Sequence, residues 1–102
     1  MDTQSNQPVA VVIGVGPGLG AALVRRFAAT YRVAMLARKA DYLKALAAEI
    51  RKSGATVLDL PCDVSDPAKI SNAFRAIRTD LGEPEMLLYN AGSGTFGQAA
   101  AL

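Results

Sequence analysis

Residues 9–20 read VAVVIGVGPGLG: a continuous apolar run is followed by a turn in which every second residue is a glycine. The run Val9–Ile13 is mostly β-branched, which is typical of a strand buried on both faces of a parallel sheet. Glycines permit a tight turn and let an anion approach the backbone, and the N-terminus of a following helix attracts negative charge. The sequence therefore predicts a phosphate-binding turn in which Gly14, Gly18 and Gly20 meet these conditions.

The spacing of these glycines separates several kinds of nucleotide-binding turn. The pattern is Gly-x-x-x-Gly-x-Gly, and a strict Gly-x-Gly-x-x-Gly fails because its third glycine would fall on Leu19 or Ala21. A phosphoryl-transfer loop needs Gly-Lys-Ser/Thr at its end, and Gly20 is followed by alanine. A methyltransferase that uses adenosylmethionine would carry an acidic residue after the second strand, where Arg38 and Lys39 stand. A dinucleotide site is favoured, and the methyltransferase is the less favoured alternative.

Strand-like and helix-like segments alternate along the rest of the chain. Short apolar runs predict the strands, and apolar residues at helical spacing between capping, proline and glycine signals predict the helices. This alternation predicts an α/β fold, in which a parallel sheet of about four strands is flanked by helices and joined by right-handed crossovers. The expected strands are residues 9–13, 32–37, 56–60 and 85–89, and the expected helices are residues 19–29, 41–53 and 67–81.

Three further expectations concern the first helix, the last residues of the chain and the edge of the sheet. In the first helix, Leu19, Leu23 and Phe27 recur every fourth residue, and we expect this stripe to face the core. Residues 98–102 predict the first turn of another helix. A four-stranded sheet would leave residues 85–89 as an apolar edge, which natural proteins usually cover or charge. We therefore expect the chain to be truncated relative to the fold that it encodes.

The composition excludes several kinds of chemistry and partner. With 51% apolar and 20% charged residues, the 102-residue chain fits one folded domain, and it has no histidine for a catalytic triad or an imidazole zinc site. Cys62 is the single cysteine, so a small buried apolar role in a cytoplasmic protein is expected for it. The net charge of +2 is scattered, and no apolar stretch reaches the roughly 18 residues of a membrane span. Nucleic acid, membrane and metal are therefore not expected partners.

Four motifs, in their order along the chain, resemble those of the short-chain dehydrogenase/reductase family. Residues 14–20 are similar to the family's Thr-Gly-x-x-x-Gly-x-Gly cofactor loop. Arg38-Lys39, after the second strand, occupies the position that selects NAD or NADP. Cys62-Asp63-Val64 resembles the family's Asp-Val step, and Tyr89-Asn90-Ala91-Gly92 resembles its Asn-Asn-Ala-Gly motif. The resemblance covers residues 9–97, which is nearly the whole chain.

This resemblance implies a Rossmann-like, doubly wound sheet with strand order 3-2-1-4 that binds a dinucleotide. It implies that Asp63 hydrogen-bonds the adenine amino group, and that Asn90 ties the fourth strand to its neighbours and touches the cofactor ribose. Because Arg38 and Lys39 stand where an acidic residue would hold the ribose hydroxyls of NAD, NADP is the expected cofactor and NAD the less favoured one. The expected cofactor-binding residues are Gly14, Gly18, Leu19, Gly20, Arg38, Lys39, Asp63, Val64, Asn90, Ala91 and Gly92.

The resemblance also implies a reaction, hydride transfer between NADP(H) and a small carbonyl or alcohol substrate, in an enzyme that forms homo-oligomers. No catalytic residue is assigned: the family uses a Ser, a Tyr-x-x-x-Lys pair and a further Asn, and neither Tyr31, Tyr42 nor Tyr89 is followed four residues later by lysine. We expect residues 1–102 to form one NAD(P)-binding unit that ends before the catalytic half, with residues 1–8 disordered, and to be inactive alone. The alternative from another class is a nucleotide-binding module without catalysis.

Overall fold

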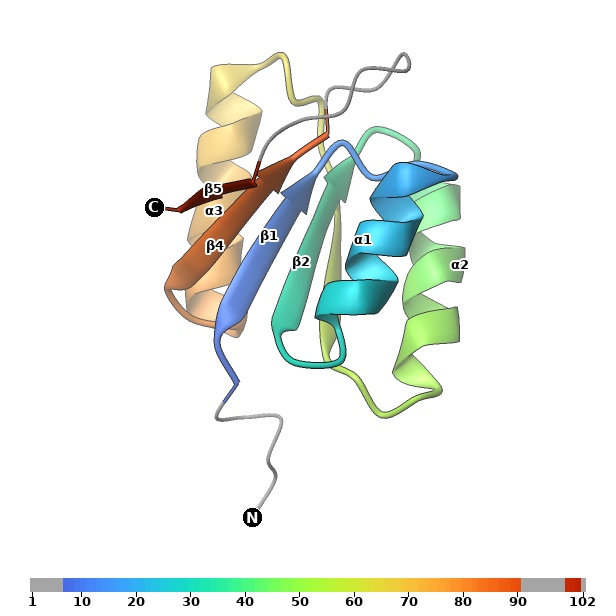
Figure 1. Ribbon diagram of the computed structural model, residues 1–102. Helices are drawn as coiled ribbons and strands as arrows, with labels where there is room; N and C mark the ends of the chain where they lie inside the picture. The colour runs from blue at the N-terminus through green and yellow to red at the C-terminus, as the bar shows by residue number, and fades with distance from the viewer. Residues whose placement is uncertain (1–6, 91–98, 102) are drawn as a thin grey trace.

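The computed structural model describes residues 7–90 and 99–101, and these form a three-layered α/β unit (Figure 1). Strands and helices alternate from the first strand to the fourth, as the sequence predicts. The strands are β1 (Val9–Ile13), β2 (Arg32–Ala37), β3 (Val57–Pro61), β4 (Pro84–Tyr89) and β5 (Ala99–Ala101), and the helices are α1 (Leu19–Phe27), α2 (Ala40–Arg51) and α3 (Pro67–Asp80).

The first four strands are parallel and lie in the order β3-β2-β1-β4. The predicted order 3-2-1-4 is therefore confirmed. β1 lies in the middle, where Val11 pairs with Ala34 of β2 on one side and with Leu87 of β4 on the other. The chain thus winds away from β1 in both directions, and the carboxyl end of β1 is the place where such sheets bind ligands.

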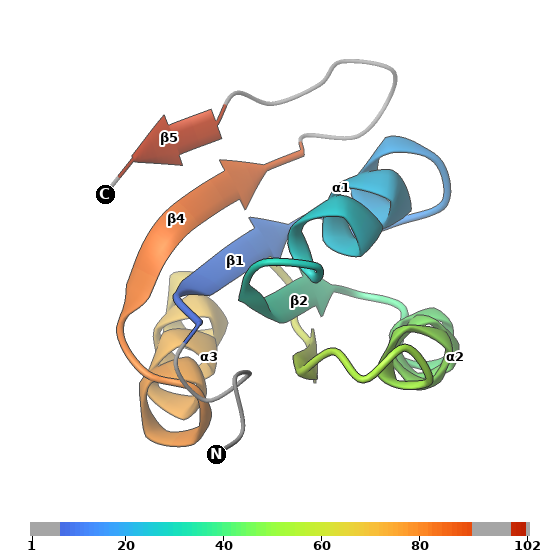
Figure 2. The same cartoon turned by 60° about the horizontal axis from the view of Figure 1, so that its bottom comes forward.

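The edge of β4 differs from the expected fold. β5 pairs antiparallel with β4, with Leu88 opposite Ala99 and Met86 opposite Ala101 (Figure 2). The predicted helical turn at residues 98–102 is therefore wrong for residues 99–101. Alanine has a high intrinsic helix propensity, but tertiary contacts can override it. Here the edge strand β4 offers a row of free backbone N–H and C=O groups, and residues 99–101 pair with them as a strand.

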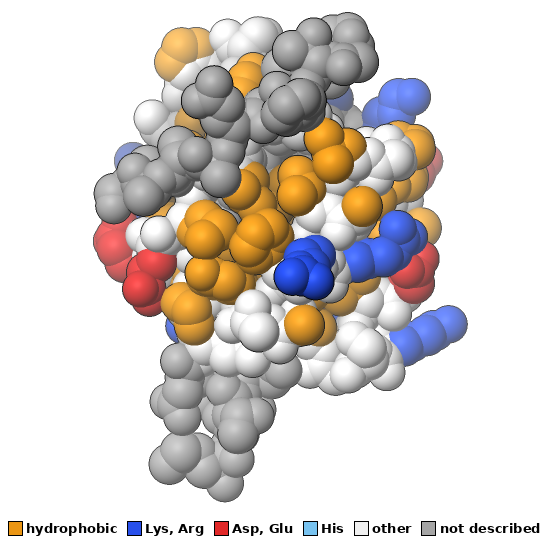
Figure 3. Space-filling view, viewed as in Figure 1, with side chains coloured by type: hydrophobic (Ala, Val, Ile, Leu, Met, Phe, Trp, Pro, Cys, Tyr) orange, Lys and Arg blue, Asp and Glu red, His pale blue; other side chains and the backbone are white. Residues whose placement is uncertain are grey.

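The core lies on both faces of the sheet. Figures 1 and 2 show α1 and α2 on one face and α3 on the other. Val12, on the first face, packs with Val24 of α1, whereas Val11, on the second, packs with Ile77 of α3. All five residues of β1 are buried, as its continuous apolar run predicts. Beside α1, apolar side chains gather over β1 and β4 on the first face (Figure 3).

Helix α1 turns a different side to the sheet from the one expected. Leu19 is 47% exposed, and Leu23 and Phe27 are only partly buried. The buried residues of α1 are instead the small ones, Gly20, Ala21 and Val24. The helix starts so close to the turn after β1 that a Cβ on Gly20 would lie 3.0 Å from the Cα of Val15. Close approach therefore selects small residues for this face, so Leu19 is left exposed, whereas Phe27 packs against the edge of the core cluster.

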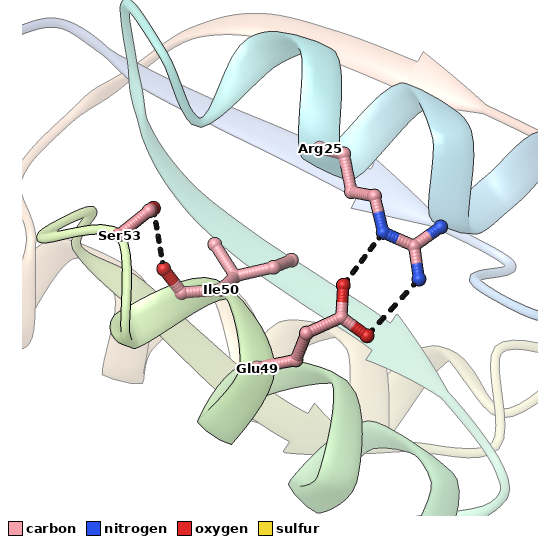
Figure 4. A network of polar contacts seen from close by, with 4 residues as sticks. All are labelled: Arg25, Glu49, Ile50 and Ser53. Carbon is pink, nitrogen blue, oxygen red and sulfur yellow. Dashed lines mark hydrogen bonds and ion pairs between the residues drawn. The ribbon is translucent and has the colours of Figure 1, made fainter.

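A two-pronged ion pair joins α1 to α2 (Figure 4). The Nε atom of Arg25 donates to Oε2 of Glu49 at 2.8 Å, and Nη2 donates to Oε1 at 3.2 Å. Nearby, the Ser53 hydroxyl donates to the carbonyl oxygen of Ile50 at 2.7 Å, and Gly54 adopts φ 91° where α2 ends. The two helices that cover the first face are thus linked to each other as well as to the sheet.

Helix α3 begins and ends at a capping residue, a proline and a glycine, the kinds of signal from which the helices were predicted. The Asp66 side chain accepts a hydrogen bond from the backbone N–H of Ala68 at 3.0 Å, and Pro67 is the first helical residue. At the other end, Gly82 adopts φ 127°, which favours glycine. No helix in the described ranges is long and apolar enough to cross a membrane.

The start of the chain differs from the expected disorder of residues 1–8. Residues 1–6 lie outside the described residues, but Gln7 and Pro8 contact the chain near the start of β2. The backbone N–H of Arg32 donates to the carbonyl oxygen of Pro8 at 2.8 Å, and its Nε donates to that of Gln7 at 2.9 Å. These two residues therefore belong to the folded unit.

Candidate cofactor-binding site

The turn after β1 is held by the ends of two neighbouring strands. The backbone N–H groups of Gly14 and Val15 both donate to the carbonyl oxygen of Leu36 in β2, at 2.8 and 3.1 Å. Gly14 has φ 85°, and a Cβ at this position would overlap the carbonyl oxygen of Asn90. Position 14 therefore requires glycine for two reasons, a positive φ and the absence of space.

Asn90 holds this turn from the side of β4. Its backbone N–H donates to the carbonyl oxygen of Ile13 at 2.9 Å, and its Nδ2 donates to the carbonyl oxygen of Gly14 at 3.3 Å. The side chain thus ties the end of β4 to the glycine turn, in line with the structural role expected for it. Ala91 and Gly92, the next two predicted site residues, lie outside the described residues.

The first turn of α1 leaves backbone donors free at the same place. Gly18 precedes the helix with φ 85°, no side chain caps it, and a Cβ on Gly18 would meet nothing within 4 Å. The backbone N–H groups of Leu19 and Gly20 form no hydrogen bond with the described part of the chain. Free N–H groups at a helix N-terminus attract an anion. The turn therefore offers an open, positively polarised surface.

A hollow of about 280 Å³ lies between this turn, the end of β2 and the start of α2. Arg38 and Lys39 enter it from β2, and both are exposed. No carboxylate is among the described residues that line it. Its lining residues are Gly14, Val15, Gly16, Pro17, Ala37, Arg38, Lys39, Tyr42 and Val64. The structure thus brings together the predicted Gly14, Arg38, Lys39 and Val64, and adds Tyr42, which sequence analysis did not assign to the site.

Asp63, after β3, has one carboxylate oxygen engaged and one free. Oδ1 accepts from the backbone N–H of Ser65 at 3.0 Å and from its hydroxyl at 2.6 Å. Hydrogen bonds from the Ser65 hydroxyl, then from its backbone, hold the pKa of Asp63 below its ordinary value of 3.8, with smaller help from the charges of Arg38 and Lys69. Oδ2 makes no hydrogen bond with the described residues. Asp63 is therefore an ionised acceptor with a free oxygen.

A second hollow, of about 310 Å³, adjoins Asp63. It is lined by Arg38, Pro61, Cys62, Asp63 and Lys69, so Arg38 borders both hollows. Lys69 was not predicted from the sequence; it lies in the first turn of α3, three residues after the capping Asp66, and lines this hollow beside Asp63. The positive charge at the carboxyl edge is therefore larger than the motif alone indicates.

Cys62 fits the role of a small buried residue. It is 7% exposed, and burial is the main cause that raises the pKa of its thiol above 9.0. A thiol that stays protonated is a poor nucleophile. Within residues 7–90 and 99–101, no three His, Cys, Asp or Glu side chains are grouped to hold a metal ion. The groups that the described site does present are the free backbone N–H groups of the turn and the exposed Arg38 and Lys39, which suit an anion.

Comparison with known proteins identifies the family. A sequence model described as short chain dehydrogenase matches residues 8–102, so the chain belongs to the short-chain dehydrogenase/reductase family. An uncharacterized oxidoreductase of Caenorhabditis elegans is 42% identical over 93 residues, which are 89% of this chain and 30% of that protein. A ketoacyl reductase of the granaticin polyketide synthase of Streptomyces violaceoruber is 36% identical over 97 residues, 94% of this chain and 36% of that protein.

Solved structures give the same result. The F189W actinorhodin polyketide ketoreductase with NADPH matches with a TM-score of 0.82 and 30% identity, over 90% of this chain and 35% of that one. The L-sorbose reductase of Gluconobacter frateurii, complexed with NADPH and L-sorbose, matches with a TM-score of 0.80 and 30% identity. The match covers 87% of this chain and 35% of the reductase. The chain spans about a third of the length of these relatives. These matches do not favour a methyltransferase or a module without catalysis.

Proposed function

We propose that this chain binds NADP(H) and forms the cofactor-binding part of an oxidoreductase that transfers a hydride between NADP(H) and a carbonyl or alcohol substrate. One observation carries the proposal: the hollow beside the glycine turn is lined by two cations and no described carboxylate. The NADPH in the matched ketoreductase and sorbose reductase structures supports the same cofactor class. A cytoplasmic location and a homo-oligomeric assembly stay predictions from the sequence.

The residues present fit a dinucleotide in the expected order. The backbone of the glycine turn, open at Gly18 and with free N–H groups at Leu19 and Gly20, would hold the diphosphate. Asp63 would accept a hydrogen bond from the adenine amino group through its free Oδ2, and Val64 would contact the base. When bound, the nicotinamide would donate or accept the hydride. What this chain supplies is binding and orientation.

The preference for NADP over NAD follows from the state of Arg38 and Lys39. Neither side chain forms an ion pair or hydrogen bond with the described residues, whereas Arg25, Arg51 and Arg78 are each paired with a carboxylate. An unpaired guanidinium can form charge-assisted hydrogen bonds with a phosphate, and a ribose hydroxyl offers no comparable charge. The 2′-phosphate that distinguishes NADP from NAD is the group these two cations suit.

Titration of the intact protein with NADP⁺ and NAD⁺ tests this proposal. Hydrogen bonds to charged groups contribute roughly 1.5–3 kcal/mol, so we expect NADP⁺ to bind roughly 10- to 150-fold more tightly. Arg38→Ala should remove most of this preference and leave the affinity for NAD⁺ almost unchanged. Arg26→Ala, at an exposed arginine on α1 outside the site, is the matched control. Equal affinities, or an Arg38→Ala variant that keeps its preference, would refute the assignment.

A further inference from the structure

Tyr42 is the third side chain with a hydrogen-bond donor on the wall of the 280 Å³ hollow. Of the described residues that line the hollow, only Arg38, Lys39 and Tyr42 have such a donor in the side chain. Lys39 is the N-cap of α2, and Tyr42 follows it by three residues, in the first turn. Residues three apart lie on the same side of a helix. The hydroxyl-bearing residue and the cation are thus presented to the hollow by the same turn.

The hydroxyl of Tyr42 forms no hydrogen bond with residues 7–90 or 99–101. Its ring is half-buried and packs against the core cluster that α1 and α2 share. Its hydroxyl is bonded to no described residue, and Tyr42 lines the hollow. The packed ring limits where the hydroxyl can go. A donor that is both positioned and unused is available to a ligand.

The charges around Tyr42 favour an anionic ligand. Arg25, whose charge faces Tyr42 from α1, is already neutralised by Glu49 (Figure 4). Asp41 is exposed and does not line the hollow. Lys39 makes no side-chain cap bond to α2, so the helix N-terminus, with its positive end of the dipole, also remains open there. The hollow therefore carries positive potential from two side chains and one helix end.

We propose that Tyr42 is a specificity-determining residue whose hydroxyl donates a hydrogen bond to the 2′-phosphate of NADP, beside Arg38 and Lys39. The inference rests on the proposed preference for NADP. A phosphate has three terminal oxygens that accept hydrogen bonds, and Pro17, which also lines the hollow, has no donor. A neutral phenol adds a directional bond without adding charge. NAD carries a 2′-hydroxyl in place of the 2′-phosphate, so the hydrogen bond from Tyr42 would add less to its binding affinity. Tyr42 would therefore increase the preference for NADP over NAD.

The test uses adenosine 2′,5′-bisphosphate and 5′-AMP, which differ only in the 2′-phosphate and need no substrate. We expect Tyr42→Phe in the intact protein to bind the bisphosphate about tenfold more weakly and to bind 5′-AMP as the unchanged protein does. Tyr31→Phe is the matched control: Tyr31 is also half-buried, but it packs on Phe27, at the opposite end of α1 from the hollow. NADP⁺ and NAD⁺ should repeat the pattern, and the thermal unfolding midpoint without ligand should be unchanged.

The outcomes separate this inference from the proposed function. If Arg38→Ala loses the preference for the bisphosphate while Tyr42→Phe keeps full affinity, the NADP assignment stands and the role of Tyr42 is refuted. If Tyr42→Phe weakens the bisphosphate and 5′-AMP equally, the residue acts on the shape of the site, and the specificity role is also refuted. If the unchanged protein binds both nucleotides equally, the NADP assignment fails, and this inference fails with it.

Discussion

Gly14 is the residue that most directly links the sequence motif to the shape of the site. It combines a φ of 85° with a position against the carbonyl oxygen of Asn90, where no Cβ fits. Gly18 has the same φ but faces open space, and Gly20 contacts the backbone of Val15. Glycine is thus favoured at the three positions for different physical reasons: close approach to Asn90 at Gly14, turn geometry at Gly18 and helix packing at Gly20.

Replacing Gly14 with alanine should destabilise the protein more than a similar change at a roomy turn. We expect Gly14→Ala to lower the free energy of unfolding by about 3 kcal/mol, from backbone strain together with the overlap with Asn90. Gly54→Ala, at φ 91° with nothing within 4 Å of a Cβ, should cost only about 1 kcal/mol. Urea unfolding of the intact protein measures both. If both variants lose the same free energy of unfolding, the overlap between a Cβ at position 14 and Asn90 does not destabilise the protein, and the prediction is wrong.

Individual site residues were predictable where a motif or a charge marked them. Arg38 and Lys39 were proposed because their charge contrasts with the acidic residue that NAD-binding sites carry after the second strand, and the structure places both on the wall of the hollow. Tyr42 belongs to no motif and carries no charge, and its spacing of three from Lys39 in the first turn of a helix is the one signal that could have indicated it. Lys69 could not be placed, because its distance from Asp63 depends on how α3 packs beside β3.

At the scale of elements, the strands were predictable because they are buried on both faces. β1 and β2 begin and end at the predicted residues, β3 is shifted by one residue at both ends, and β4 begins one residue earlier than predicted. The orientation of α1 was not predictable from its apolar periodicity, because periodicity reflects the hydrophobicity of the residues and not their size. At α1 the controlling factor is how near the helix lies to the sheet, and this selects Gly20 and Ala21.

The ion pair between α1 and α2 should make a pH-dependent contribution to stability. Hydrogen bonding to Arg25 holds the pKa of Glu49 below its ordinary value of 4.5. Since the folded pKa is the lower one, the contribution is present above about pH 4.5 and is lost as the pH falls through the folded pKa. We expect Glu49→Gln to lower the thermal midpoint slightly at neutral pH and to match the unchanged protein in acid.

Thermal unfolding followed by circular dichroism at several pH values checks this expectation. The effect should be small, because both side chains are about half exposed and exposed ion pairs contribute little. Glu85→Gln is the control, since Glu85 is exposed and pairs with no described residue. A difference between Glu49→Gln and the unchanged protein that persists in acid would mean that the side chain acts through packing instead.

At the scale of the whole molecule, the parallel sheet followed from the alternation of strands and helices, but the cover of its edge did not. Alternation allows few arrangements, and the resemblance to the family, rather than the alternation itself, implied the order 3-2-1-4. β5 joins the sheet in the opposite direction because β4 presents a free edge, and no periodic signal in three alanines encodes that partner. The apolar face beside α1 in Figure 3 is likewise a property of the assembled sheet.

Residues 1–102 alone are expected to oxidise no NADPH above background with any ketone or aldehyde. The chain has the residues proposed to hold the cofactor but no tyrosine followed four residues later by lysine, and proton transfer by such a group typically contributes roughly 10²- to 10⁴-fold. The loss of NADPH absorbance measures the rate. Turnover that responds to Arg38→Ala would contradict this prediction, because it would require an acid–base group within these residues.

The hydrogen bond from Asn90 to Gly14 joins residues 76 positions apart, and this separation affects when the protein becomes able to bind its ligand. Local contacts form early in folding, whereas contacts between distant parts of the chain form only after a long loop has closed. The glycine turn cannot take its final shape until β4 has docked against β1. During refolding, nucleotide binding should therefore appear after helix content has recovered, so that the ligand recognises only chains whose central sheet is complete.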